Sequence, residues 1–310
     1  MEKRRKIILD CDPGHDDAIA ILLAGQIRYF DLLAITTCAG NQTIDKTSRN
    51  AFNVARYLGF GCPIAKGATL PLVQELTTCP SVHGESGLDG FDFPNYKYDF
   101  SPLNGTELII KTLLDHEDVT VVTTGPMTNL ALALRLEPKI KEHIREVIFM
   151  GGTTDYGNVS PAAEFNILVD PEACYIVLHS GLKVKMVGLN VTRKALVNKD
   201  IIAKVRAIGN TASRMVGDLL DVFLENQIKT FGIKEAPLHD PVTIASMIDE
   251  SCVTFKPYNV DVDISHGPSY GRTNVDMFDY LKQEKNCFVA IDIDSERFWN
   301  VVLDGIKEFN

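Results

Sequence analysis

The stretch Lys6–Asp17, with the sequence KIILDCDPGHDD, places four carboxylates directly after a short apolar run. The run at residues 7–9 predicts a buried parallel strand. The acids therefore leave the carboxyl end of this strand, where open α/β sheets bind their ligands. Two like charges about 4 Å apart repel by about 4 kcal/mol at an effective dielectric of 20. Protons held at raised pKa values could neutralise these charges, but a hard divalent cation with oxygen ligands is the simpler explanation.

Strand-like and helix-like segments alternate along the rest of the chain. Strands are expected at residues 31–37, 63–66, 119–123, 146–150, 183–189 and 287–293, and helices at 18–23, 43–58, 106–114, 127–136 and 295–308. This order predicts one α/β domain, residues 1–310, built on an open, mostly parallel, Rossmann-like sheet flanked by helices. The alternating segment 258–264, followed by a turn at 265–267, predicts a small antiparallel addition.

The composition limits the partners and the compartment. The formal net charge is −10, from 31 basic and 41 acidic side chains. This excess of negative charge argues against nucleic acid or an anionic membrane as the main partner. It is compatible with a small neutral ligand or a cation. We expect no signal peptide and no membrane span. The seven cysteines include no C-x-x-C pair, which favours reduced thiols in the cytoplasm, and Cys11 is expected to be inert packing.

Three other interpretations of the aspartate cluster fit less well than a metal site. A calcium EF-hand would need ligands where Gly14 and Ile21 stand. A haloacid-dehalogenase-type phosphatase also begins with a strand and Asp-x-Asp, but usually has threonine or valine in place of Gly14. Capping of a helix that starts at Ala18 explains the last two aspartates in part. It does not explain Asp10 and Asp12, which lie upstream.

Three further segments carry polar side chains suited to a site. Residues 158–166, NVSPAAEFN, combine amides and an acid that suit vicinal hydroxyls, although loop asparagines commonly serve turns. The pair His239 and Asp240 either caps a helix or joins a general acid to a metal carboxylate. The loop at 77–90, with His83 near its middle, is either a lid or a surface excursion.

Together these motifs resemble the nucleoside hydrolases, and within that family the bacterial pyrimidine-specific ribonucleoside hydrolases. The marks are DCDPGHDD at 10–17, AGN at 39–41, EFN at 164–166 and HD at 239–240, in the family's order. The resemblance extends to about Asp294. It implies hydrolysis of the N-glycosidic bond of ribonucleosides to ribose and free base, in cytoplasmic nucleoside salvage, by a homotetramer or a dimer.

The resemblance also implies a calcium site. Ca²⁺ would be held by Asp12, Asp17, Asp240 and the main-chain oxygen of Thr124, with Asp10 as a supporting acid. The ion would activate a water, and Asp12 would be the general base that takes its proton. An anionic pocket would favour the oxocarbenium-like transition state.

The same resemblance implies which residues bind the substrate. They are Asp16, Asn41, His83, Asn158, Glu164, Phe165, Asn166, Gln227, Phe231 and His239. Those that grip the ribose should reject 2′-deoxynucleosides, because buried partners would be left unpaired. His83 and His239 are the candidates for donating a proton or a hydrogen bond to the leaving base, and His239 is the better one. A structural role is the alternative for either histidine.

The prediction of the base preference rests on one helical segment and on the lack of a second tryptophan. Pyrimidine-preferring relatives place glutamine and tyrosine one helical turn apart; here Gln227 matches, but Phe231, which can stack and cannot donate a proton, replaces the tyrosine. Purine-specific relatives use two tryptophans, and this chain has only Trp299. Uridine and cytidine are therefore the expected substrates. The alternatives are broad purine and pyrimidine specificity, a Mg²⁺-dependent phosphatase with Asp10 as nucleophile, and a non-enzymatic nucleoside- or calcium-binding protein.

Overall fold

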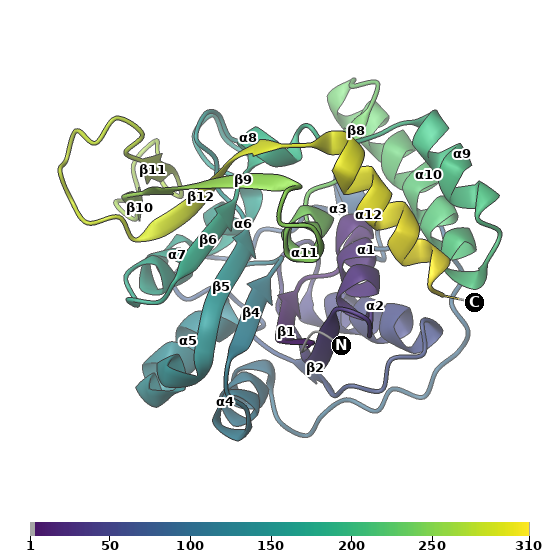
Figure 1. The fold of residues 1–310 in the computed structure, drawn as a ribbon, viewed down its shortest axis with the longest axis horizontal. Coiled ribbons are helices and arrows are strands. Elements are labelled where there is room, and N and C mark those ends of the chain that lie inside the picture. Colours follow the sequence, from purple (N-terminus) through teal and green to yellow (C-terminus); the bar gives the residue numbers. More distant parts are fainter. Residues whose placement is uncertain (1–3, 310) are drawn as a thin grey trace.

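The central feature of the computed structural model, which describes residues 4–309, is an eight-stranded sheet (Figure 1). In spatial order its strands are β3 (Ile64–Lys66), β2 (Phe30–Thr37), β1 (Arg5–Cys11), β4 (Val119–Thr123), β5 (Ile144–Met150), β6 (Val184–Val187), β12 (Cys287–Ile293) and β9 (Val253–Tyr258). All neighbouring strands are parallel except β9, which runs antiparallel to β12 at the edge. The predicted α/β class and mostly parallel sheet are confirmed.

Strand β1 shows why this sheet is buried on both faces. Ile7, Ile8 and Leu9 have no exposed surface. Ile7 and Leu9 pack into the core on one face, and Ile8 packs into the core on the other. Such two-sided burial is typical of parallel strands covered by helices. Cys11, at the strand end, is also fully buried, and this burial raises the pKa of its thiol, which supports a packing role.

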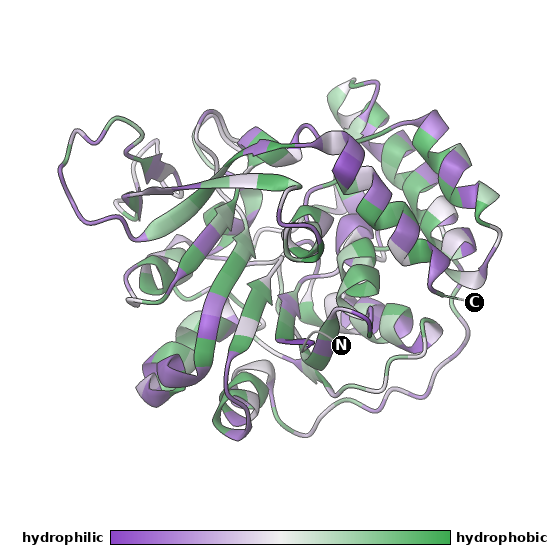
Figure 2. Ribbon diagram, in the orientation of Figure 1, coloured by the Kyte–Doolittle hydropathy of each residue, from purple (hydrophilic) through white to green (hydrophobic). Residues whose placement is uncertain are grey.

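Helices cover both faces of the sheet (Figure 1). Their bounds are α1 (His15–Ala24), α2 (Ile44–Tyr57), α3 (Pro80–His83), α4 (Gly105–Asp115), α5 (Thr128–Leu136), η1 (Pro138–His143), α6 (Phe165–Val169), α7 (Pro171–Leu178), α8 (Leu189–Thr192), α9 (Lys199–Ala207), α10 (Thr211–Phe231), α11 (Pro241–Ile248) and α12 (Ser295–Lys307). Helices α1, α2 and α9–α12 share the core of one face, and α4, α5 and α7 that of the other. Figure 2 shows the mainly hydrophobic sheet and the mixed surfaces of α9, α10 and α12. Within residues 4–309, no helix is both long and apolar enough to span a membrane.

Two local features differ from the sequence prediction. Helix α1 begins at His15 rather than Ala18, because Gly14 caps it and donates its N–H to the Asp17 carboxylate at 3.0 Å. The antiparallel addition has two parts: β9 in the main sheet, and a separate pair of β10 (Val260–Val262) with β11 (Thr273–Val275). The connection between β10 and β11 is longer than the predicted turn. A further short pair joins β7 (Leu196–Val197) and β8 (Ala236–Pro237).

Candidate active site

A cavity of about 480 Å³ opens at the carboxyl ends of the parallel strands. Asp16 follows β1, Asn41 follows β2, and Thr124 follows β4. This is the edge at which open α/β sheets bind ligands. Most of the predicted site residues contribute to its wall: Asp16, Asn41, His83, Thr124, Asn158, Glu164, Phe165, Asn166, Gln227, Phe231, His239 and Asp240.

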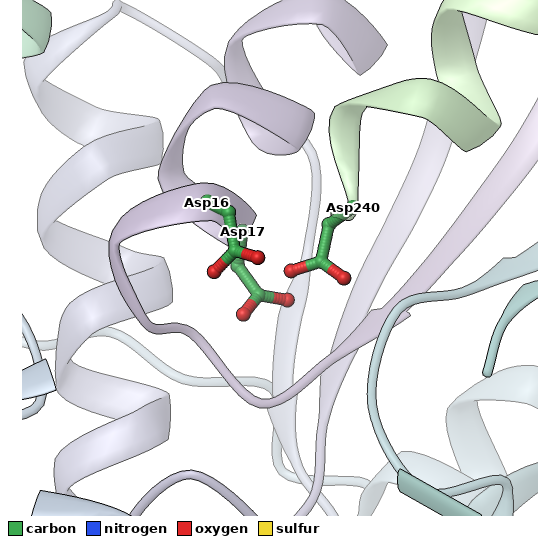
Figure 3. A group of neighbouring side chains, drawn as sticks. All are labelled: Asp16, Asp17 and Asp240. Atoms are coloured by element: carbon green, nitrogen blue, oxygen red, sulfur yellow. The ribbon is translucent and has the colours of Figure 1, made fainter. Parts of the chain in front are cut away.

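Three carboxylates from two distant parts of the chain meet at this cavity, and two of them, Asp16 and Asp240, line it. Asp16 and Asp17, in the first turn of α1, face Asp240 at the start of α11 (Figure 3). One oxygen from each carboxylate lies within 4.8 Å of the others. Asp17 and Asp240 are thus together, as the calcium interpretation expects. The third member of this closest group is Asp16. Asp12, the other expected ligand, is outside the group but near enough for the charges of Asp17 and Asp16 to raise its pKa.

Asp12 is enclosed by the turns that follow β1, β2 and β4. It has no exposed surface, and its Oδ2 accepts the backbone N–H of Asn41 at 2.7 Å. Its Oδ1 is buried and has no hydrogen-bond partner within residues 4–309. A Cβ on Gly40 would lie 2.1 Å from Oδ2, and one on Gly125 would lie 2.6 Å from Oδ1. The two glycines therefore form a close-fitting cradle around this carboxylate.

The charges of these buried acids are poorly compensated by the protein. Burial, and then repulsion from Asp16, raises the pKa of Asp17 to about 7. Burial, together with neighbouring carboxylates, also raises the pKa values of Asp12 and Asp240. Among residues 4–309, one carboxylate oxygen of Asp12 and one of Asp16 have no hydrogen-bond partner. Such free carboxylate oxygens match the ligand preferences of a hard divalent cation. The residues present therefore fit a metal ion.

Asp10, like Asp12 and Asp17, is fully buried and does not contribute to the cavity wall. The Asp10 carboxylate is fully buried, and its Oδ1 accepts hydrogen bonds from Thr36 Oγ1 at 2.6 Å and Asn129 Nδ2 at 2.8 Å. Burial raises the pKa of Asp10 to about 7. These two side-chain donors occupy one oxygen of Asp10 and favour a supporting role over that of a phosphatase nucleophile.

The segment around α6 supplies the polar side of the wall. Glu164 caps α6, and its carboxylate accepts the backbone N–H groups of Asn166, Ile167 and Gly152 at 2.9, 3.2 and 3.0 Å. Burial raises its pKa to about 7. Asn166 Nδ2 donates to the Thr124 carbonyl oxygen at 2.7 Å, which fixes that oxygen at the cavity. A carbonyl oxygen has a second lone pair, so Thr124 can still accept a cation.

Two histidines from segments far apart in the sequence also line the cavity. His83 ends α3, and His239 precedes α11. Burial lowers the pKa of each imidazole, so both rings are neutral near pH 7. Thr192 Oγ1 lies 2.7 Å from His239 Nδ1 and holds that ring. Because Val82 and His83 are buried in the wall, the 77–90 segment is part of the site rather than a surface excursion.

Helix α10 contributes an apolar and amide surface. Gln227 is buried, whereas Phe231 is 51% exposed. Phe223 also lines the cavity, and the sequence analysis does not single it out. Its spacing of four residues from Gln227 places both on one helical face and could have identified it. Arg193 is a second omission: it donates to the carbonyl oxygens of residues 156 and 157 at 3.0 and 2.8 Å and holds that loop at the cavity.

The fold and the site together define an α/β enzyme with an acidic pocket that suits a metal ion and a small hydroxylated substrate. The family model described as inosine-uridine preferring nucleoside hydrolase matches residues 7–300. The chain belongs to this family, which confirms the resemblance.

Known relatives agree over the full length of the chain. The pyrimidine-specific ribonucleoside hydrolase RihB of Escherichia coli K12 is 39% identical over 310 residues, which cover 100% of this chain and 99% of the relative. The structure of a purine-preferring ribonucleoside hydrolase from Gardnerella vaginalis matches with a TM-score of 0.91, 31% identity and 98% coverage of both chains. The plant nucleoside hydrolase PpNRh1 matches with a TM-score of 0.92, 27% identity and coverage of 98% and 99%.

Proposed function

We propose that this chain hydrolyses the N-glycosidic bond of ribonucleosides to ribose and free base, with uridine and cytidine preferred. The observation that carries the proposal is the cluster of Asp16, Asp17 and Asp240, with Asp12 close to it, at a cavity whose wall also includes the polar α6 segment. The pyrimidine preference is supported by the name and the 39% identity of the RihB relative. Gln227 offers an amide to a base edge, and Phe231 offers a ring for stacking.

The proposed metal is calcium, held by Asp12, Asp17, Asp240 and the main-chain oxygen of Thr124. Carboxylates plus a carbonyl form the oxygen-only ligand set that calcium prefers. When bound, such a cation lowers the pKa of a coordinated water and orients substrate hydroxyls. Asp10 supports the group from below, through its contacts with Thr36 and Asn129.

The protein's own residues carry the remaining steps. Asp12 accepts a proton from the attacking water as general base. The surrounding carboxylates stabilise the positive charge that develops on the ribosyl ring. The ribose hydroxyls are bound by Asp16, Asn41, Asn158, Glu164 and Asn166, and Phe165 contacts the substrate with its ring. His83 and His239 face the leaving base, and His239 is the stronger candidate for its donor.

A panel of nucleosides with reducing-sugar detection, with and without chelator, tests this proposal. Uridine and cytidine should release ribose, and chelator should abolish the release. Equal rates with inosine would favour the broad-specificity alternative. Binding of uridine without release of base would favour a binding protein, and phosphate release from sugar phosphates would favour a phosphatase.

We further propose that residues 1–310 form one nucleoside hydrolase domain that works in the cytoplasm, in nucleoside salvage, as a homotetramer or a dimer. The full-length match to RihB supports the single domain. The cytoplasmic location, the role in nucleoside salvage and the oligomeric state are proposed from the family resemblance. Light scattering of the purified protein would determine the oligomeric state.

Calcium is expected to raise the melting temperature of the chelator-treated protein more at pH 8 than at pH 5. Asp17 has its pKa raised from 3.8 to about 7, so its protonated form is favoured in the metal-free fold. That contribution to stability is complete below pH 3.8 and is lost as the pH rises through about 7. Below that pH, protons compete with the cation for the same oxygens. Thermal unfolding with CaCl₂ or EDTA measures the difference; equal shifts at both pH values would contradict the site.

The substitution Gly40→Ala is expected to lower kcat for uridine by about 10²-fold, the typical effect of a displacement of about 1 Å at a reacting group. The added methyl would lie 2.1 Å from Asp12 Oδ2 and must displace the carboxylate. Gly61→Ala is the matched control, because a Cβ there meets nothing within 4 Å. Normal turnover in Gly40→Ala would show that the position of Asp12 is not critical.

A further inference from the structure

The side chain of Arg193 reaches across to the loop that carries Asn158. Arg193 follows α8, the short helix after β6 of the central sheet (Figure 1), and it lines the cavity. Its guanidinium pairs with the Asp155 carboxylate at 3.1 Å and donates to the carbonyl oxygens of Tyr156 and Gly157 at 3.0 and 2.8 Å. It also stacks on the Tyr156 ring, with Cζ 3.8 Å from the ring centroid. One side chain thus binds the three consecutive residues directly before Asn158.

Gly157 is the residue of this loop with the greatest conformational freedom. The loop turns so tightly here that a Cβ would lie 2.1 Å from the Ala163 carbonyl oxygen, which excludes a side chain. A glycine populates more backbone conformations than any other residue, and fixing it costs more entropy. The chain therefore places its most flexible kind of residue immediately before Asn158, a proposed ribose-binding residue.

Both peptide units that flank Gly157 are held at opposite edges. In a trans peptide the carbonyl and the N–H point in opposite directions. Arg193 binds the carbonyl oxygens of the two units. The N–H of Gly157 donates to the Pro161 carbonyl oxygen at 3.2 Å, and the next N–H, that of Asn158, donates to the Ala163 carbonyl oxygen at 3.2 Å. Each peptide plane is thus fixed between α8 and the loop itself, and without the guanidinium it would keep only the contact within the loop.

The side chain of Asn158 has one polar group left for a ligand. Its Oδ1 accepts the backbone N–H of Phe165 at 3.0 Å. Its Nδ2 has no hydrogen-bond partner in the described part of the chain, residues 4–309, and Asn158 lines the cavity. An amide nitrogen can only donate, so Asn158 offers N–H groups to an oxygen of a ligand. A rotation of the peptide between Gly157 and Asn158 would move this donor.

We propose that Arg193 is a positioning residue for ribose recognition: by fixing both peptides around Gly157, it holds the Asn158 N–H donor toward one hydroxyl of the sugar. This inference rests on the proposed function. The role depends on the shape of the guanidinium. Its donors form a rigid planar fork that also stacks on an aromatic ring, whereas the single ammonium of lysine cannot bind three acceptors and stack in this arrangement. The alternative is that Arg193 acts only through its positive charge in an acidic cavity, and lysine would preserve that charge.

Kinetics with deoxy analogues test this role. Arg193→Lys should lower kcat/KM for uridine by about 10- to 100-fold, as for a substrate-positioning group displaced by up to about 1 Å. Asn158→Ala should also lower it. Each variant should lose its preference for uridine over the same one of 2′-, 3′- and 5′-deoxyuridine, because both changes act on one hydroxyl. A normal kcat/KM in Arg193→Lys would show that charge suffices and would overturn the proposal, as would losses directed at different hydroxyls.

A double variant and a matched control separate positioning from general loss of structure. If Arg193 acts through Asn158, adding Arg193→Lys to Asn158→Ala should lower kcat/KM by less than about a further twofold, because changes in one contact network are not additive. Losses that multiply in the double variant would overturn the proposal. The control is Arg206→Lys, since Arg206 binds two carboxylates, Asp218 and Asp221, away from the cavity wall. It should leave all four substrates unchanged.

Hydrogen exchange tests the fixing of the loop independently of activity. Mass spectrometry of peptides that cover residues 153–165 should show faster exchange of the Gly157 and Asn158 amides in Arg193→Lys than in the unaltered protein, because local opening of the loop costs less. Arg206→Lys should exchange at the unaltered rate there. Unchanged exchange in Arg193→Lys would overturn the proposal. Faster exchange in a protein that hydrolyses no riboside would instead show that the proposed function has failed, so the two failures are distinguishable.

Discussion

Asp12→Asn is expected to lower kcat for uridine by about 10²–10⁴-fold, the typical contribution of a positioned general base. The amide keeps the shape of the side chain and an oxygen that can accept the Asn41 N–H, but it cannot accept a proton from water at neutral pH. Steady-state kinetics measures the loss. The KM is expected to change less than kcat. Repeating the assay at several CaCl₂ concentrations shows whether the substitution also lowers the affinity for the metal.

The fold of this variant should be at least as stable as that of the unaltered protein without metal. Burial and the charge of Asp17 raise the pKa of Asp12, which means that the ionised form is unfavourable in the metal-free fold. A neutral amide removes that repulsion. Asp170→Asn is a contrasting control, because Asp170 caps α7 away from the cavity wall and both of its oxygens accept hydrogen bonds, from Leu72, Thr128 and Ala173. The amide cannot accept all three, so this variant should lower the melting temperature and leave kcat within a few-fold. Turnover of Asp12→Asn within a few-fold of the unaltered protein, at an unchanged melting temperature, would remove Asp12 from the chemistry.

The fold is predictable where the chain follows simple periodicity. The run at residues 7–9 and the VTVVT of β4 are apolar without interruption and form buried central strands. Strand β9, by contrast, contains Lys256 and Pro257 and is half exposed at the sheet edge, so no apolar pattern marks it. Helix α10 carries usable signals, an Asn210 cap and Gly232 at φ +67° after its end, that the sequence analysis did not combine.

The candidate site is predictable where a motif leaves a strand end, and not where it depends on tertiary packing. Asp17 lies close to Asp240, as the resemblance implies, but the third member of the closest carboxylate group is Asp16 rather than Asp12. The contact of His15 with His83 joins residues 68 positions apart. No local pattern indicates it, because both the strand–helix turn and the 77–90 segment must fold before the two rings meet. The same holds for Thr192 and His239, whose contact spans 47 positions.

2′-Deoxyuridine is expected to be hydrolysed with a kcat/KM about 10⁴-fold lower than that of uridine. A site that pairs buried polar groups with a substrate hydroxyl rejects the analogue without it by about 10⁴–10⁵-fold, because those groups are then left unpaired. Asp16 Oδ1 is such a group: it is buried at the cavity and has no hydrogen-bond partner within residues 4–309. Kinetics with uridine, 2′-deoxyuridine and 3′-deoxyuridine measures the discrimination.

Two variants locate the source of this discrimination. Asp16→Ala removes the unpaired acceptor. The preference for uridine over one of the two deoxy analogues should therefore fall. The analogue for which it falls identifies the ribose hydroxyl that Asp16 binds. Phe231→Leu is the control, because Phe231 lies on α10 with the proposed base-binding residues. It should slow uridine and 2′-deoxyuridine by the same factor. If the unaltered protein accepted 2′-deoxyuridine within about tenfold of uridine, the polar wall around α6 and Asp16 would have to serve the fold rather than ribose.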